Sequence, residues 1–326
     1  MRSLTRKALF ALDTAVAATL HPVFRQRLGK FRIVSFLFHA LLTREEMHAG
    51  KVDPQQETTP EYFRSFLLSL RSYGFRFLSL EELELPGELH GDYALITFDD
   101  GYFNNVRSLP IIEELQVPIS IFLTAQNVTQ SRRFWWDVVF TEMKRRGSSL
   151  EQIRRRQESM KRLSRRTVDE QLVAEFGTEV FTPCSDADRP LTASEVRQLA
   201  NHPLVTFGNH TNAHEILPAR STSQITRELE SAQQILHELI GRRLKTFAYP
   251  SGAATAEVAE CVQNCGLQFA FTTQRGIIDD TALRARYFLR RNLVDGRDSI
   301  QSQILRAWSP LGLAAALQPR RTYAAQ

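Results

Sequence analysis

The stretch Ala94-Leu95-Ile96-Thr97-Phe98-Asp99-Asp100-Gly101-Tyr102 decides how this chain folds and where its chemistry lies. Its first five residues are apolar or β-branched, which predicts a buried strand. Two adjacent acids end that strand, and a glycine opens the turn. Burial of two carboxylates is costly unless a cation neutralises them or catalysis requires them. The alternative is a solvated turn, because Asp and Gly are ordinary turn residues.

A second cluster lies about 110 residues further on, in Gly208-Asn209-His210-Thr211-Asn212-Ala213-His214, after the short strand signal 204–207. Two histidines four residues apart fall on one face of a helical turn and can direct their ring nitrogens at one cation. Histidine suits zinc and similar divalent ions, and one carboxylate completes a three-ligand set with a position open for water. The two clusters together predict a shared catalytic metal site.

A third segment, Phe247-Ala248-Tyr249-Pro250-Ser251-Gly252, is again a short apolar strand followed by a tight turn. Proline fixes φ, and glycine permits close approach of the backbone. A free backbone N–H in such a turn can donate to an oxyanion. Taken alone, the segment is equally consistent with an ordinary β-turn.

These three segments resemble the first three motifs of the polysaccharide deacetylases, carbohydrate esterase family four with the chitooligosaccharide deacetylase homology domain. The matching residues are 97–101, then His210-Thr211-x-x-His214, then Tyr249-Pro250-x-Gly252. The segment 33–39 also resembles the first strand of many bacterial members. The resemblance covers roughly residues 31–295, and it implies an α/β fold, a distorted, incomplete (β/α)7 barrel.

The resemblance also implies roles for single residues. Asp100, His210 and His214 would hold a divalent metal, zinc first, with cobalt, nickel or manganese as alternatives. Asp99 would be the general base that takes a proton from water on the metal. The backbone N–H of Ser251 would stabilise the oxyanion formed from an N-acetyl group. Two further side chains are candidates either for the substrate groove or for packing, namely Tyr102 and Tyr249.

The departures from the family pattern raise two questions. Many members carry an arginine two residues before the third-motif proline, where it orients the base, but this chain has Ala248. We expect Arg290 or Arg291 to supply that cation. The family's last motif offers a histidine as general acid, yet no histidine follows His237. His39, at the end of the first predicted strand, is the candidate for the acid or for a neighbour of the metal ligands, or else a core histidine.

Alternating strand and helix signals predict parallel pairing, with all three motifs at carboxyl ends of strands, where α/β barrels place their chemistry. Strands are predicted at 31–39, 75–78, 92–98, 117–123, 204–207, 245–249 and 267–273. Helices are predicted at 60–73, 103–115, 193–202, 222–240 and 254–265. The domain plan is a basic extension (1–30), the barrel (31–309) with a helical insertion at about 134–190, and a C-terminal tail (310–326).

Basic residues concentrate in two blocks, although the net charge of the chain is only +5. Residues 144–166 contain ten Lys/Arg and two Glu, and residues 1–32 contain seven Lys/Arg and one Asp. Such blocks predict peripheral contact with an anionic membrane or a lipid-linked glycan, or else solvated helix faces. Nucleic acid is not expected as a partner, because no reader motif accompanies the charge. Trp135 and Trp136, at the start of the insertion, either cap the barrel or stack on sugar rings.

The first twenty residues leave the location open. Their basic start and apolar stretch resemble a signal peptide for export, but Asp13 interrupts the stretch, and an amphipathic surface helix fits equally well. The pattern favours a cytoplasmic or membrane-peripheral location. The three cysteines, Cys184, Cys261 and Cys265, do not make a disulfide framework.

We therefore expect a metal-dependent hydrolase that removes N-acetyl groups from amino sugars of a bacterial polysaccharide or glycan precursor. One alternative is a deformylase or deacylase of a lipid-linked sugar. Another is a catalytically inactive glycan-binding protein. An intact Asp99 argues against the inactive protein, since binding alone would not need a base.

Overall fold

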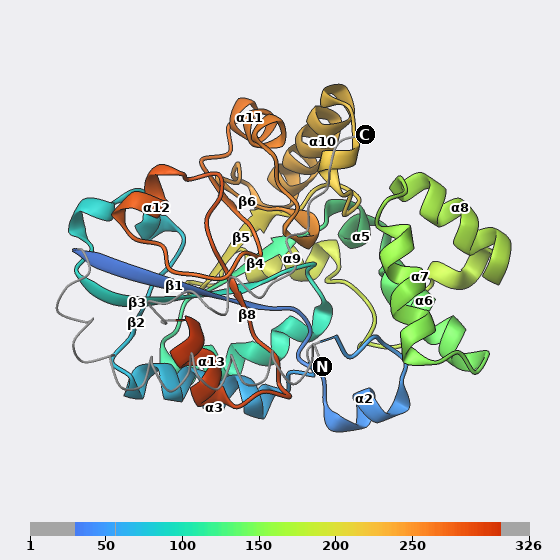
Figure 1. Cartoon of the computed structure of the whole chain (residues 1–326), viewed down its shortest axis with the longest axis horizontal. Coiled ribbons are helices and arrows are strands. Elements are labelled where there is room, and N and C mark those ends of the chain that lie inside the picture. The colour runs from blue at the N-terminus through green and yellow to red at the C-terminus, as the bar shows by residue number, and fades with distance from the viewer. Residues whose placement is uncertain (1–29, 56, 308–326) are drawn as a thin grey trace, which may run out of the picture.

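The structure, a computed structural model, describes residues 30–307 apart from residue 56 (Figure 1). The predicted N-terminal extension, except for Lys30, and the predicted C-terminal tail lie outside the described residues. Within the described part of the chain, none of the helices combines the length and the apolar composition needed to cross a membrane.

The core of the fold is a curled sheet of eight strands in the order β7-β6-β5-β4-β3-β1-β8, with β2 paired to β3. All pairs between named strands are parallel. Bridges from Ile278 to Ile33 and from Leu289 to Phe271 cover the gap between the sheet ends. The predicted incomplete barrel is thereby confirmed. The strands are β1 (Phe31–Phe38), β2 (Arg76–Phe77), β3 (Gly91–Phe98), β4 (Ile119–Leu123), β5 (Val205–Asn209), β6 (Thr246–Ala248), β7 (Phe269–Phe271) and β8 (Asn292–Leu293).

Helices cover the outer face of the sheet (Figure 1). Each of the five predicted helical regions contains a helix, although 103–115 is divided into a 3-10 turn and α4. The α-helices are α2 (Arg44–Ala49), α3 (Pro60–Ser72), α4 (Leu109–Leu115), α5 (Ala125–Gln130), α6 (Trp135–Arg145), α7 (Leu150–Met160), α8 (Arg165–Phe176), α9 (Ala193–Leu199), α10 (Thr222–Ile240), α11 (Ala256–Asn264), α12 (Asp280–Arg284) and α13 (Ile300–Ala307). The 3-10 turns are Glu81–Glu84, Pro86–Glu88, Phe103–Ser108, Thr178–Phe181, Leu217–Ala219 and Pro250–Gly252.

Local signals begin several of these helices where the sequence predicts. Thr59 caps α3 through a hydrogen bond from the backbone N–H of Tyr62, and a proline occupies the first turn. Thr192 and Glu195 form a complete capping box at α9. An aromatic cluster then fixes α3 against β1 and β3: Phe38 contacts Phe63 edge-on, with ring centroids 5.1 Å apart.

The insertion forms a lobe of three helices, α6, α7 and α8, beside the carboxyl ends of the strands (Figure 1). It has its own apolar core, which includes Trp135, Ile153 and Leu172, all buried. The insertion returns to the barrel at Pro190, which forms an antiparallel bridge with Tyr102. At the start of the lobe, the ring of Phe134 packs on Tyr102 with centroids 4.3 Å apart, so both ends are held next to the first motif.

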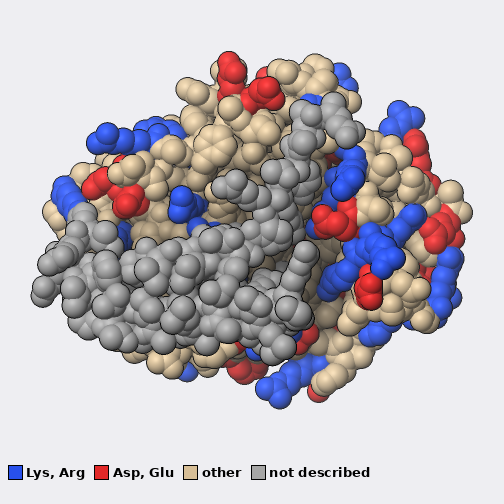
Figure 2. All heavy atoms as spheres, viewed as in Figure 1, with Lys and Arg blue, Asp and Glu red and all other residues tan. Residues whose placement is uncertain are grey.

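Much of the positive charge of the insertion is paired. Arg155 contacts Glu151 at 2.8 Å, Arg166 contacts Glu170 at 2.8 Å, and Glu175 contacts both Arg146 and Arg156. Figure 2 shows basic and acidic side chains intermingled on this lobe. These pairs favour solvated helix faces over a uniformly basic surface. Contact with an anionic membrane or a lipid-linked glycan stays a prediction.

Candidate metal centre and catalytic site

The first two motifs meet because β3, β4 and β5 are consecutive parallel strands of the sheet. Asp99 and Asp100 follow β3, and His210 follows β5. The backbone N–H of Asp99 donates to the carbonyl of Phe38 at 3.0 Å, and that of His210 donates to Leu123 at 3.0 Å. These bonds tie both loops to the ends of neighbouring strands, so the side chains that follow point into one space.

The three predicted metal ligands, Asp100, His210 and His214, converge in this space. Oδ1 of Asp100 lies 3.5 Å from Nε2 of His210 and 3.5 Å from Nε2 of His214. One donor atom from each residue lies within 4.8 Å of the others. Asp100 Oδ1 is buried and has no hydrogen-bond partner within the described residues. One carboxylate and two imidazoles with an orphaned oxygen between them fit a divalent cation, and this donor set suits zinc.

The loops that carry the ligands are held in unusual conformations. Asp100, Thr211 and His214 have φ values of 74°, 68° and 56°, in the left-handed region that non-glycine residues rarely adopt. Such conformations persist only where surrounding contacts enforce them, and they are concentrated at functional sites. In this loop the side chain of Asn209 accepts the N–H of Thr211 at 2.8 Å, which helps to hold the turn between the two histidines.

The two histidines are oriented by different means. Nδ1 of His210 lies 2.7 Å from the carbonyl of Ala248, and because a carbonyl only accepts, Nδ1 carries a proton and Nε2 is the ring nitrogen on the side of Asp100. Nδ1 of His214 is buried with no hydrogen-bond partner among the described residues. Burial, followed by the charge of His210, holds the pKa of His214 well below its usual value, so its ring stays neutral and able to ligate.

Asp99, the predicted base, is buried beside this cluster and pairs with Arg291. The guanidinium donates to both carboxylate oxygens, at 2.6 and 2.7 Å. Burial opposes the charge of Asp99, but attraction to Arg291 and then to His210 outweighs it, so the pKa of Asp99 is lowered. Arg291 is itself fixed, because its Nε donates to the carbonyl of Thr272 at 3.0 Å. The arrangement keeps a charged carboxylate in one orientation next to the proposed ligands.

Of the two predicted arginines, the structure pairs Arg291 and not Arg290 with Asp99. Arg290 is exposed, and its side chain passes over Gly276. In extended chain, neighbouring side chains point to opposite faces, so only one of two adjacent arginines can enter the barrel. That residue is Arg291, which is fully buried.

His39 lies at the end of β1, where the predicted strand meets the site. Its Nδ1 is buried without a hydrogen-bond partner in the described part of the chain, and its carbonyl accepts the Nδ2 of Asn105 at 2.6 Å. The carbonyl of Phe38, the residue before it, accepts the backbone N–H of Asp99 at 3.0 Å. His39 therefore lies next to the loop that carries Asp99.

The third motif adjoins the second. Ala248 accepts the proton of His210, and the turn Pro250–Gly252 follows two residues later. Ser251 is half-buried with φ of 55°, and a side chain at Gly252 would collide with Thr273. These features hold the turn at the end of β6, beside His210.

The sequence allowed two tyrosines and two tryptophans either to contact substrate or to pack in the core, and the structure shows them packed. Tyr102 and Tyr249 are fully buried, and the hydroxyl of Tyr249 donates to the carbonyl of Tyr287 at 3.0 Å. Trp135 and Trp136 are 5% and 9% exposed, which leaves little ring surface for a sugar. They cap the barrel with the insertion. Sequence reasoning missed the contact that this cap makes with His214, because no motif connects residues so far apart in the chain.

Comparison with known proteins agrees with this geometry. Residues 87–270, more than half of the chain, match the family model for polysaccharide deacetylase. No curated protein matches the chain. The solved structures similar to it include the Streptococcus pyogenes deacetylase PplD in complex with acetate, at a TM-score of 0.58 and 16% identity, covering 85% of this chain and 98% of that one.

Two further solved structures share the fold at similar levels. IcaB from Ammonifex degensii has a TM-score of 0.57 and 19% identity, covering 85% of this chain and 97% of its own. The de-N-acetylase from Aggregatibacter actinomycetemcomitans has a TM-score of 0.58 and 14% identity, with 84% and 99% covered. Identities this low establish the fold alone. The match to the family model goes further, and the chain belongs to the polysaccharide deacetylase family, whose enzymes hydrolyse N-acetyl amide bonds.

Proposed function

We propose that this protein is a metal-dependent hydrolase that removes N-acetyl groups from amino sugars of a bacterial polysaccharide or glycan precursor. The observation that carries the proposal is the convergence of Asp100, His210 and His214 beside a base, Asp99, that an arginine holds in its charged form. A protein that only bound glycans would gain nothing from a buried, charged carboxylate next to a set of metal ligands.

Asp100, His210 and His214 would hold the ion, with zinc as the first choice. When bound, a divalent ion lowers the pKa of water and polarises an acyl carbonyl. Asp99 accepts the proton of the attacking water. Because Arg291 binds both oxygens of Asp99, the carboxylate stays charged and aimed at the ligand cluster. A lowered pKa makes a weaker base, so Asp99 depends on a water molecule that is already acidified.

The other two roles belong to residues that follow β6 and β1, the strands next to β5 and β3. The backbone N–H of Ser251 donates to the oxygen of the acyl group as charge develops on it. His39, with an unpartnered buried Nδ1, donates a proton to the departing amine. Acetate and a free amino sugar are the products. Arg291 takes the place of the arginine that many relatives carry before the third-motif proline, since Ala248 has no side chain able to reach Asp99.

The test uses the full-length protein, stripped of metal and reconstituted with zinc, and measures acetate released from N-acetylglucosamine oligomers. We expect Asp99→Asn to keep its zinc and lose about 10²- to 10⁴-fold in turnover, the range for a general base. The matched control is Asp92→Asn. Asp92 is also buried and pairs with Arg32 at 2.6 Å, but it lies near the start of β3, whereas Asp99 follows its end.

Each result has a separate meaning. Loss of turnover in Asp99→Asn but not in Asp92→Asn supports Asp99 as the base. Unchanged turnover in Asp99→Asn removes it from that role. If the wild-type protein binds zinc but releases no acetate from any N-acetylated oligosaccharide tested, the proposed reaction is wrong.

A further inference from the structure

The insertion helix α6 forms one wall of the proposed metal centre. The ring of Trp136 lies against the ring of His214, with centroids 4.6 Å apart and the planes tilted by 58°. Trp136 is almost completely buried, so its ring is not free to turn toward solvent. The contact joins a helix outside the barrel repeat to a proposed metal ligand 78 positions later in the chain.

This contact matters because His214 lacks the device that orients His210. The ring of His210 is fixed by a hydrogen bond from Nδ1 to the carbonyl of Ala248. Nδ1 of His214 has no such partner in the described part of the chain. A histidine ligand whose second nitrogen makes no hydrogen bond must be oriented by packing, since metal affinity depends on the ring direction. Trp136 supplies that packing on one side, and the ring of His210 lies on another, with centroids 5.0 Å apart.

A relay of hydrogen bonds holds Trp136 in place. Its indole N–H donates to the hydroxyl of Tyr102 at 2.7 Å, and this hydroxyl donates to Oδ2 of Asp137 at 2.8 Å. Oδ1 of Asp137 accepts the backbone N–H of Asp53 at 2.8 Å. Only Gly101 separates Tyr102 from Asp100. The relay therefore connects the Asp100 loop to the wall beside His214.

The backbone of Trp136 is held from the other side of the insertion. Nε2 of Gln157, on α7, donates to the carbonyl of Trp136 at 2.9 Å and to Oδ2 of Asp53 at 2.8 Å. Nη2 of Arg154 donates to Oδ1 of Asp53 at 2.8 Å. Both the ring and the backbone of Trp136 are therefore held by a buried network that includes α6, α7 and the loop before α3.

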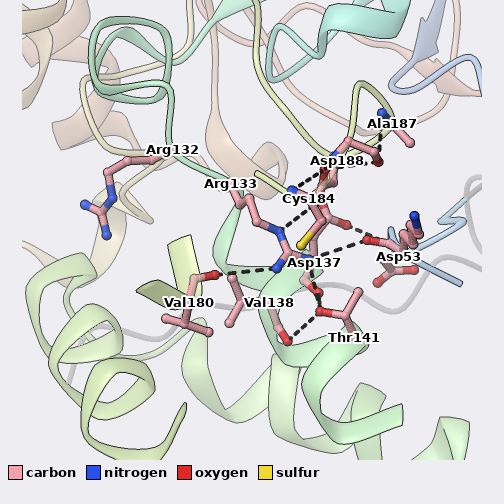
Figure 3. A network of polar contacts seen from close by, with 12 residues as sticks. Asp53, Arg132, Arg133, Asp137, Val138, Thr141, Val180, Cys184, Ala187 and Asp188 are labelled. Atoms are coloured by element: carbon pink, nitrogen blue, oxygen red, sulfur yellow. Dashed lines mark hydrogen bonds and ion pairs between the residues drawn. The ribbon is translucent and has the colours of Figure 1, made fainter. Parts of the chain in front are cut away.

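The N-terminal end of α6 is also held by buried polar contacts (Figure 3). Arg133 pairs with Asp188 at 2.6 Å, and both side chains are buried. Nη2 of Arg133 also donates to the hydroxyl of Thr141 at 3.0 Å, and that hydroxyl donates to the carbonyl of Asp137 at 2.9 Å. Figure 3 shows Asp137 between this group and Asp53. The first turn of α6 thus has fixed neighbours on each side.

We propose that Tyr102 and Asp137 are positioning residues for the metal centre, acting through Trp136 to hold the ring of His214 in the direction that binds the ion. The inference rests on the proposed function, because it assumes that His214 is a ligand. It assigns the helical insertion a task beyond covering the barrel, which is to set the affinity for the metal. Tyr102, Asp137 and Trp136 touch neither substrate nor ion in this role.

The test compares two tyrosines that each lose only a hydroxyl. Tyr102→Phe removes the acceptor for Trp136 and the donor to Asp137. Tyr62→Phe is the matched control: its hydroxyl donates to the carbonyl of Asp298 at 3.0 Å, in a contact between α3 and the segment before α13. Zinc affinity of each metal-free protein is measured by competition with a chromophoric chelator, and the thermal midpoint is measured without metal.

We expect both variants to lose some thermal stability, and Tyr102→Phe alone to bind zinc about tenfold more weakly, the lower end of the effect of outer partners of metal ligands. The visible spectrum of the cobalt-substituted protein should change in Tyr102→Phe and not in Tyr62→Phe. At saturating zinc, kcat of Tyr102→Phe should recover to near that of the wild type, because the variant changes occupancy more than chemistry.

A second variant keeps the proposal open to refutation if Tyr102→Phe does not fold. Trp136→Phe retains an aromatic wall but has no indole N–H to fix it, so it should also weaken zinc binding. Wild-type zinc affinity and an unchanged cobalt spectrum in either folded variant would show that the network serves stability alone. A wild-type protein that binds no zinc would instead remove the proposed function, which separates the two failures.

Discussion

Two buried aspartates, Asp99 in the barrel and Asp137 in the insertion, differ in how their charge is treated. Asp99 accepts two hydrogen bonds from the guanidinium of Arg291, and its pKa is lowered despite burial. Asp137 accepts from a backbone N–H and a phenol, and its pKa is raised well above the usual value by burial and then by the charge of Asp53. The same residue type thus provides a charged carboxylate in the barrel and a polar anchor in the insertion.

The difference follows from which cation can reach each carboxylate. Arg291 lies in the barrel interior and binds both oxygens of Asp99. Arg133 lies near Asp137 but pairs with Asp188, and Arg154 pairs with Asp53. Both of these arginines therefore form their ion pairs with carboxylates other than Asp137. A carboxyl group left in this way favours its neutral form.

Removal of Arg291, the cation that pairs with Asp99, should have the largest effect on the free energy of unfolding. In Arg291→Met, Asp99 would remain buried without its partner, so we expect a loss of about 3–5 kcal/mol in the free energy of unfolding. The pKa of Asp99 should rise, and acetate release should fall with it. Urea unfolding followed by circular dichroism measures the first effect, and the acetate assay the second.

Arg290→Met is the matched control, because it removes a neighbouring arginine that is exposed and that no contact places near Asp99. We expect a change within about 0.5 kcal/mol, as for most surface substitutions. Equal losses in the two variants would contradict the claim that Arg291 alone carries the pairing.

The sequence was sufficient for the motifs and for much of the fold, since each depends on local pattern. The strand before Asp99 and the alternation of strands and helices have a visible period. The pairing of His210 with His214 was predicted from a helical turn, but the structure brings them together in a non-helical loop in which Thr211 and His214 have positive φ. Strand β8 was missed because two residues, Asn292–Leu293, carry no period, and its pairing with β1 depends on the closed shape of the sheet.

The remaining gaps concern residues distant in sequence. Either Arg290 or Arg291 could have faced Asp99. Adjacent side chains of an extended segment point to opposite sides, and the sequence does not show which of the two points into the barrel. Nor did any local pattern indicate that Trp136 would lie against His214, because that contact requires the whole insertion to fold onto the barrel. A single sequence does not indicate which side chains of one helix or strand will support a site carried by another.

The contrast between the two aspartates also predicts opposite dependences on pH. Asp99 has a lowered pKa in the folded protein, so it adds stability above the unfolded pKa of about 3.9, and this stability is lost as pH falls through the folded pKa. Asp137 has a raised pKa, so the folded state binds its proton more tightly than the unfolded state. Its contribution is complete below about pH 3.9 and is lost as pH rises toward the folded pKa, by up to about 1.4 kcal/mol per pH unit.

Asp137→Asn isolates the second of these effects. The amide can accept and donate as the neutral acid does but cannot ionise. We expect the stability of the variant relative to the wild type to become more favourable as pH rises from 4 to 7, measured by urea unfolding at each pH. Asp99→Asn should show the opposite trend over acidic pH. A stability difference that is the same at every pH would contradict the raised pKa of Asp137.

The exposed charges of the insertion should matter least. Arg155 and Glu151 form an i,i+4 pair on α7, and their side chains are 78% and 81% exposed. Water screens such a pair, so Arg155→Ala should change the free energy of unfolding by at most about 0.5 kcal/mol. A double-mutant cycle with Glu151→Ala measures the pair itself, and we expect its coupling energy to disappear in 1 M salt. A coupling that persisted at high salt would mean that the surface of the insertion is less hydrated than its exposure indicates. Asp99, Asp137 and Glu151 are all carboxylates, and we attribute their different behaviour to burial or exposure. A salt-resistant coupling at Glu151 would contradict that explanation.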